Sequence, residues 1–174
     1  MGLYRNLTAC DPARAPRFEG ETDFFVYRRA VEAVTEAHLY VGSPEELKYM
    51  LMRPARAHEF GRGWNSQPGD MDPLHWAIYG RTRLPLIPCK DPDTEVYPLV
   101  LNSPEDVRAI FTAFGTLDRA ALLKHPAVPA IFADPFMRTI PPRTTENTWD
   151  GIEVIGRFYR DAAAQGWEVY SYTS

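Results

Sequence analysis

The last quarter of the chain joins one long helical pattern to a strand pattern through a single glycine. Over residues 147–165, apolar side chains recur at helical spacing and form one broad stripe, made of Ile152, Ile155, Phe158, Tyr159, Ala162 and Ala163. Gly166 then supplies the residue that a helix end most often needs in the left-handed conformation. Residues 167–173 alternate as in a strand, with Trp167, Val169 and Ser171 on one face and Glu168, Tyr170 and Tyr172 on the other. We expect this unit to be the spine against which the rest of the chain packs.

A second alternating segment, residues 2–10, begins the chain and predicts a strand in the same sheet as the C-terminal one. Helical spacing and capping residues predict the helices between these strands, over residues 23–38, 43–53, 74–79, 103–114 and 118–124. In the helix over 103–114, Val107, Ile110, Phe111 and Phe114 are expected to point inward. A further strand is expected over residues 95–101. The sequence therefore predicts an α+β fold in which several helices pack on a small sheet that includes the N- and C-terminal strands.

Length and charge restrict the class of protein. With 174 residues, one compact domain over 1–174 is expected, and its core is large enough to need no disulfide framework. The net charge is −4 and the arginines are scattered, which argues against nucleic acid as a partner. No apolar run reaches membrane-spanning length and no signal peptide is visible, so we expect a cytoplasmic protein without a membrane segment. Cys10 and Cys89 form no paired motif and are expected to stay reduced.

Residues 53–70 form the least regular stretch, with three glycines, two prolines and two side chains of interest, Arg62 and Trp64. Tryptophan and arginine anchor many protein interfaces, and glycine lets a backbone approach its partner closely. This stretch therefore predicts a binding loop that includes Arg62 and Trp64. The competing interpretation is that Trp64 folds back over the core, which is the commoner fate of a loop tryptophan.

Histidine and acidic residues near this loop raise the question of a metal or catalytic site. His58 and Glu59 lie within the loop, while His75 and Trp76 begin the following helix. The spacing matches no known zinc signature, because there is no HExxH motif and no cysteine pair. We therefore expect no metal and no cofactor, and we interpret His58, Glu59, His75 and Trp76 as candidate binding residues beside Arg62 and Trp64.

The order of segments resembles the YfbM-like family of small bacterial α+β proteins. Segments along nearly the whole chain carry the resemblance, namely the start Met1-Gly2-Leu3-Tyr4, the stretch Asp72-Pro73-Leu74-His75-Trp76-Ala77-Ile78-Tyr79-Gly80, the turn Leu117-Asp118-Arg119-Ala120-Ala121-Leu122, and the helix end Phe158–Gly166 with its strand. The chain departs from the family over residues 47–53, where the family has a helix that ends in Leu-Leu-Thr-Gly. The resemblance implies the fold, and it brings no activity and no site residues.

Two functions are consistent with these observations. The first is a bacterial cytoplasmic binding protein without catalytic activity, monomeric or weakly dimeric, whose partner is a protein or a small molecule. The second is a small hydrolase or transferase whose site is assembled from His58, Glu59, Arg62 and His75. The first is preferred, because the sequence contains no recognisable catalytic arrangement.

Overall fold

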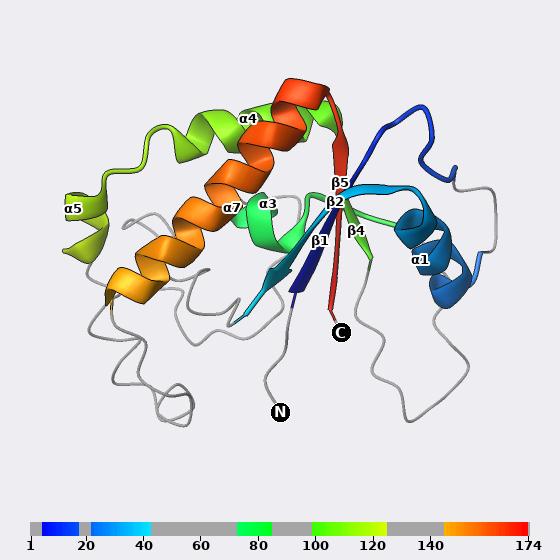
Figure 1. Ribbon diagram of the computed structural model, residues 1–174, viewed down its shortest axis with the longest axis horizontal. Coiled ribbons are helices and arrows are strands. Elements are labelled where there is room, and N and C mark those ends of the chain that lie inside the picture. The colour runs from blue at the N-terminus through cyan, green and yellow to red at the C-terminus, as the bar shows by residue number, and fades with distance from the viewer. Residues whose placement is uncertain (1–4, 18–21, 43–72, 85–98, 125–144, 174) are drawn as a thin grey trace.

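The structure is a computed structural model that describes residues 5–17, 22–42, 73–84, 99–124 and 145–173 (Figure 1). The helices and strands follow one another as β1 (Arg5–Cys10), α1 (Phe24–Ala33), β2 (Thr35–Val41), α3 (Pro73–Tyr79), β3 (Thr82–Arg83), β4 (Val100–Asn102), α4 (Pro104–Phe114), α5 (Arg119–Leu123), α7 (Thr145–Gln165) and β5 (Glu168–Thr173). The α+β class expected from the sequence is confirmed.

The two ends of the chain lie side by side in one sheet. The sheet has five strands in the order β2-β1-β5-β4-β3, and every neighbouring pair is antiparallel. Strands β1 and β5 pair from Arg5 opposite Thr173 to Cys10 opposite Glu168. The prediction that the N- and C-terminal strands share a sheet is therefore confirmed, and this pairing places both terminal strands in its interior.

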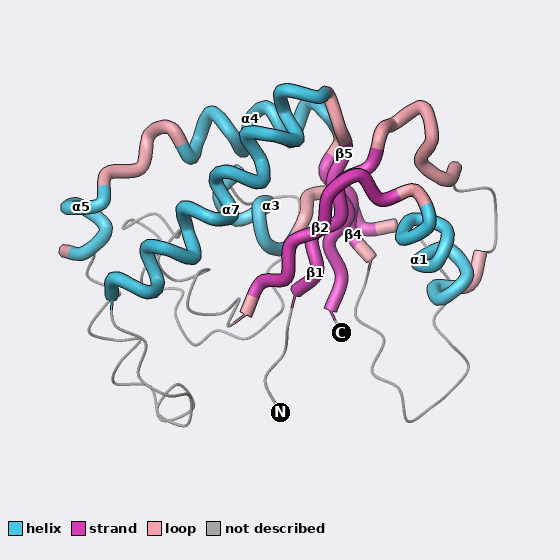
Figure 2. Tube along the Cα trace, in the orientation of Figure 1, coloured by secondary structure: helices cyan, strands magenta, loops and turns pink. Residues whose placement is uncertain are grey.

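Each face of the sheet is covered by different helices. Figures 1 and 2 show α3, α4 and α7 on one side of the strands and α1 on the other. The first core cluster joins the sheet to those three helices and includes Leu7, Ala9, Val169, Ile78, Ile110, Ile155 and Tyr159. The second cluster lies under α1 and includes Cys10, Phe24, Tyr27, Val31, Tyr170 and Tyr172. The alternation predicted for β5 is confirmed, because Val169 belongs to one cluster and Tyr170 to the other.

The helix predicted over residues 23–38 is too long. Asp23 caps its start as expected, by accepting hydrogen bonds from the backbone N–H of Phe25 and Val26, but α1 ends at Ala33. From Thr35 the chain becomes β2, in which Ala37 pairs with Ala9 and Leu39 with Leu7. Residues 35–41 satisfy both a helical and an alternating pattern, and pairing with β1 decides for the strand because tertiary packing overrides weak local propensity.

The other local predictions that fall on described residues agree with the structure except at one side chain. Helices α3, α4 and α7 occur where expected, Ser103 and Asp106 form the capping box of α4, and Gly166 has a φ of 70°. Phe111 is expected to face the core, yet it is 41% exposed, because the inward side of α4 is formed by Val107 and Ile110, with Ala113 and Phe114 packed against the same core cluster. Of the strand expected over residues 95–101, the described end belongs to β4. The helix expected over 43–53 lies outside the described residues.

Among the described residues, no helix combines the length and the apolar character required to cross a membrane.

Replacing Gly80 with alanine is expected to destabilise the protein more than replacing Gly166 with alanine. Both glycines have a φ of +70°, so either substitution places an L residue in the left-handed region, at a cost of about 1–2 kcal/mol. A Cβ at position 80 would lie 2.6 Å from the Cβ of Val100, whereas at position 166 it would meet no described atom within 4 Å. Overpacking of this kind adds about 1–3 kcal/mol.

Urea denaturation of the two variants measures this difference, and Gly166→Ala serves as the control for backbone strain alone. Equal losses of unfolding free energy would mean that the sheet relaxes around residue 80, and would contradict the close approach of α3 to β4.

Candidate functional site

The C-terminal end of α3 is held by buried side chains from other elements. The last carbonyls of a helix have no partner within it. Three of those in α3 accept hydrogen bonds from side chains of other elements, the Trp76 carbonyl in addition to the backbone N–H of Gly80. Asn102 Nδ2 donates to the carbonyl of Trp76 (2.9 Å), the Tyr159 hydroxyl to that of Ala77 (2.8 Å), and the Ser171 hydroxyl to that of Ile78 (2.7 Å). These donors come from β4, α7 and β5, so the end of α3 is tied to all three.

Asn102 connects this arrangement to the residue that follows the helix. Its side chain is fully buried, Oδ1 accepts from the backbone N–H of Arg81 (2.9 Å), and Nδ2 also donates to the Tyr159 hydroxyl (3.1 Å). Burial raises the pKa of Tyr159, so this hydroxyl stays protonated as a donor. Gly80 turns the chain in the left-handed conformation, and Arg81 therefore leaves the helix at a fixed place beside β4.

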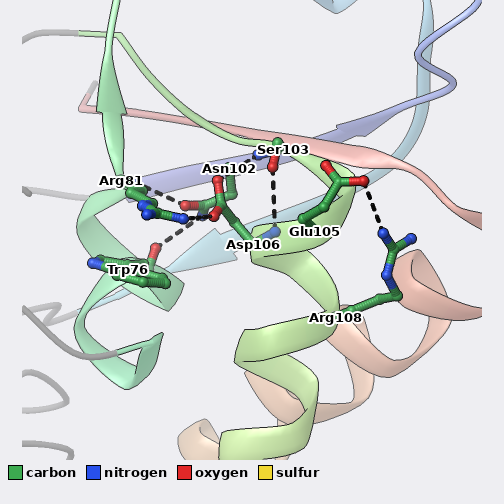
Figure 3. Close-up of polar contacts among 7 residues, drawn as sticks. All are labelled: Trp76, Arg81, Asn102, Ser103, Glu105, Asp106 and Arg108. Atoms are coloured by element: carbon green, nitrogen blue, oxygen red, sulfur yellow. Dashed lines mark hydrogen bonds and ion pairs between the residues drawn. The ribbon is translucent and has the colours of Figure 1, made fainter.

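The side chain of Arg81 lies between an indole ring and a carboxylate (Figure 3). Its guanidinium carbon is 4.6 Å from the centre of the Trp76 ring, within the range of a cation–π contact. Its Nη1 donates to Asp106 Oδ1 at 2.5 Å. The Arg81 side chain is 50% exposed, whereas that of Asp106 is 5% exposed. We call Trp76, Arg81 and Asp106 the arginine platform.

The start of α4 fixes Asp106. Ser103 Oγ accepts from the backbone N–H of Asp106, and Asp106 Oδ2 accepts from the backbone N–H of Ser103 at 3.0 Å. Both carboxylate oxygens of Asp106 are therefore engaged. The residue before Asp106, Glu105, pairs with Arg108 at 2.9 Å on the exposed side of the helix (Figure 3). The carboxylate that holds Arg81 is thus part of a helix cap and cannot easily follow a displaced guanidinium.

The structure describes two of the six site residues predicted from the sequence, His75 and Trp76. Trp76 contributes the ring of the arginine platform. The His75 ring is stacked on that of Tyr79 at 4.8 Å, and Arg5 lies over the same Tyr79 ring at 4.9 Å, which places His75 in a different group. The remaining candidates, His58, Glu59, Arg62 and Trp64, lie outside the described residues, and their roles stay predictions.

Arg81, Asn102 and Asp106 are not among the site residues predicted from the sequence. Asp106 belongs to the capping box of α4, a local role that gives no sign of a further partner. Arg81 follows the glycine that ends α3, a position with no periodic signal. The Arg81–Asp106 contact spans 25 residues of sequence, so no local pattern could have revealed it.

A second polar cluster lies on the opposite face of the sheet, under α1. The Tyr170 hydroxyl donates to Glu168 (2.7 Å), the Tyr172 hydroxyl to Glu32 (2.9 Å), and the Tyr27 hydroxyl to the carbonyl of Pro16 (2.7 Å). Burial raises the pKa of all three tyrosines, which keeps these donors protonated. All three hydroxyls bind groups of the chain itself: the Tyr172–Glu32 bond joins β5 to α1, the Tyr27–Pro16 bond joins α1 to the segment after β1, and the Tyr170–Glu168 bond lies within β5.

The same face contains a cysteine that is poorly suited to nucleophilic chemistry. Cys10 is fully buried, and burial together with the nearby Glu168 and Glu36 carboxylates raises the pKa of its thiol to about 12. The reactive form of cysteine is the thiolate. Cys10 is therefore a packing residue. Within the described part of the chain, no three histidine, cysteine, aspartate or glutamate side chains gather as a possible metal site.

Comparison with known proteins supports the fold and assigns no activity. No protein-family model matches the sequence, and neither does any curated protein. The crystal structure of YfbM from Escherichia coli, a protein of unknown function, is similar with a TM-score of 0.62 and 14% sequence identity, over 98% of this chain and 99% of that one. The chain therefore has the YfbM fold over nearly its whole length, as the sequence resemblance implied. At this identity the likeness extends to the fold alone.

Tyr159→Phe is expected to lower the unfolding free energy by about 1–3 kcal/mol, although it removes a single oxygen. The carbonyl of Ala77 loses its donor and Asn102 Nδ2 loses an acceptor, both in a buried site. Urea denaturation measures the loss, and Tyr40→Phe, at a tyrosine that is 53% exposed, is the control with a smaller expected effect. Equal effects would indicate that water replaces the Tyr159 hydroxyl.

Arg81→Ala is expected to cost about 1.5–3 kcal/mol, which is more than a surface arginine usually contributes. It deprives the buried Asp106 carboxylate of its ion pair, and hydrogen bonds to charged groups are worth this much. Arg108→Ala is the matched control, because Arg108 and its partner Glu105 are 55% and 74% exposed, and its cost should stay within about 0.5 kcal/mol. Chemical denaturation compares the two, and similar losses would show that water solvates Asp106 well without Arg81.

Proposed function

We propose that the protein is a binding protein without catalytic activity, which recognises its partner through the arginine platform of Trp76, Arg81 and Asp106. The partner is a protein or a small molecule of the bacterial cytoplasm. The observation that carries this proposal is the state of Arg81, whose side chain is half exposed and yet is held by an indole ring and a buried carboxylate.

An arginine of this kind differs from an ordinary surface arginine. A free arginine side chain loses rotamer entropy when it binds a partner, which opposes binding. Arg81 has lost much of that freedom already, because Trp76 and Asp106 fix its guanidinium and Asn102 fixes its backbone. Tryptophan and arginine also dominate the energetics of protein interfaces. These features support recognition at this surface.

The chemistry of the described residues supports binding more than catalysis. The thiol of Cys10 is buried with a raised pKa, and the hydroxyl groups of Tyr159 and Ser171 hold backbone carbonyls of α3. These groups have structural partners, which leaves them poorly placed for a reaction. The alternative, a small hydrolase or transferase that uses His58, Glu59, Arg62 and His75, remains a prediction, because three of these residues lie outside the described part of the chain.

The loop over residues 53–70 belongs to the same proposal, since it precedes α3 closely in sequence. Arg62 and Trp64 would extend the contact area that Trp76 and Arg81 begin, and His58 and Glu59 would add polar contacts. A reduced, buried Cys10 is consistent with a reducing compartment. We propose a monomer or a weak homodimer as the binding unit.

The test is capture of partners from the native cytoplasm by immobilised wild type, Arg81→Gln and Arg108→Gln. At least one protein or small molecule should be retained by wild type and Arg108→Gln and reduced at least tenfold with Arg81→Gln, as expected for a loss of about 1.4 kcal/mol or more. A Trp64→Ala arm tests the loop in the same way. Circular dichroism at the capture temperature establishes that each variant is folded.

The proposal is contradicted if folded Arg81→Gln retains the same set of molecules as wild type and Arg108→Gln. A partner that depends on Trp64 and not on Arg81 would place recognition in the loop, away from the arginine platform.

A further inference from the structure

Resting on the proposed function, we propose that Arg81 binds a carboxylate group of the ligand, through the guanidinium edge formed by Nε and Nη2. The chemical class of the docking group depends on which Arg81 donors the protein itself already uses.

A guanidinium has five N–H donors in a rigid plane, and Nε and Nη2 together present two parallel N–H bonds along one edge. This edge matches the two oxygens of a carboxylate. Asp106 engages Nη1, which lies on the other side of the group. Within the described residues, Nε and Nη2 donate to no acceptor, while the side chain is 50% exposed. Among the described residues, no acceptor therefore occupies the edge that suits a bidentate group.

The position of this edge is fixed before any ligand arrives. Figure 3 shows the guanidinium above the Trp76 ring with Asp106 to one side. Three contacts define the residue, namely the ring at 4.6 Å, the Asp106 oxygen at 2.5 Å and the backbone N–H bond to Asn102 at 2.9 Å. A preorganised guanidinium loses less entropy per hydrogen bond formed. The indole face also offers apolar contact to the carbon that carries the carboxylate.

The local charge favours a carboxylate over a phosphate. The charge of Arg81 is balanced by Asp106, and that of Arg108 by Glu105. A single negative charge added at Nε and Nη2 gives an arginine between two carboxylates, with a net charge of about −1. A doubly charged phosphate is attracted more strongly by Arg81 and repelled more strongly by Asp106, and it leaves a net charge of about −2 beside the buried carboxylate. Arg83, exposed two residues further on, attracts any anion and does not distinguish the two.

The test is an NMR titration of the full-length ¹⁵N-labelled protein with sodium acetate, at constant ionic strength because screening weakens exposed charges. The Arg81 Nε–H signal, identified by its loss in Arg81→Lys, should shift and saturate with a Kd on the order of 10–100 mM, as expected of one bidentate charged contact. Arg108→Gln should behave as wild type. Arg81→Lys keeps the positive charge but lacks the two parallel N–H donors, so it should bind acetate about fivefold more weakly or worse. Binding to this variant is followed by the backbone amide signal of residue 81.

Three outcomes would overturn the inference. One is the absence of a saturable shift at the Arg81 Nε–H signal. Another is equal binding by Arg81→Lys, which would mean that a point charge suffices. The third is that inorganic phosphate binds as tightly as acetate in a parallel titration. If one of these results is found while capture of a partner still depends on Arg81, the carboxylate inference fails and the proposed binding function stands. If capture does not depend on Arg81, the proposed function itself fails.

Discussion

The structure depends most on the hydrogen bonds that the backbone carbonyls at the C-terminal end of α3 accept. A buried carbonyl without a donor costs about 1–3 kcal/mol. In this short helix the carbonyls of Ala77 and Ile78 have donors from α7 and β5, and that of Trp76 accepts from Asn102 of β4 as well as from the backbone N–H of Gly80. Asn102 is central because its amide also binds Tyr159 and the backbone of Arg81. One set of buried hydrogen bonds therefore sets the relative positions of helices α3 and α7 and of strands β4 and β5. Apolar packing between helices and sheet alone would specify these positions less strictly.

The arginine platform is a consequence of this arrangement. Gly80 can approach Val100 only without a side chain, and its left-handed turn directs Arg81 toward the start of α4. There the capping box holds Asp106 through Oδ2, and Oδ1 accepts from Arg81. Arg81, through which recognition is proposed, is thus held by two buried side chains, Asn102 at its backbone and Asp106 at its guanidinium. Function and stability are coupled at Arg81, because the residue that would meet a ligand also neutralises a buried carboxylate.

The two faces of the sheet bury different kinds of side chain. The face toward α3, α4 and α7 is mainly apolar, with Leu7 and Val169 packed against Ile155. The face under α1 buries tyrosines, and their hydroxyls are satisfied by carboxylates and a carbonyl within the chain. Much of the aromatic content of the sequence is therefore core, and Trp76 is the described aromatic that holds an ion-paired, half-exposed arginine.

The sequence by itself determined the features that local chemistry specifies. The long C-terminal helix, the turn at Gly166, the alternation of β5 and the cap at Ser103 follow from spacing and from conformational preference within a few residues. It also located α3, and with it Trp76. The strand β2 was decided only by tertiary structure, because residues 35–41 fit two patterns and pairing with β1 selects one. The same is true of Arg81 and Asp106, which meet because Gly80 and β4 bring the end of α3 to the start of α4. A contact between residues 25 apart has no local signal in one sequence, and the packing of the sheet is what creates it.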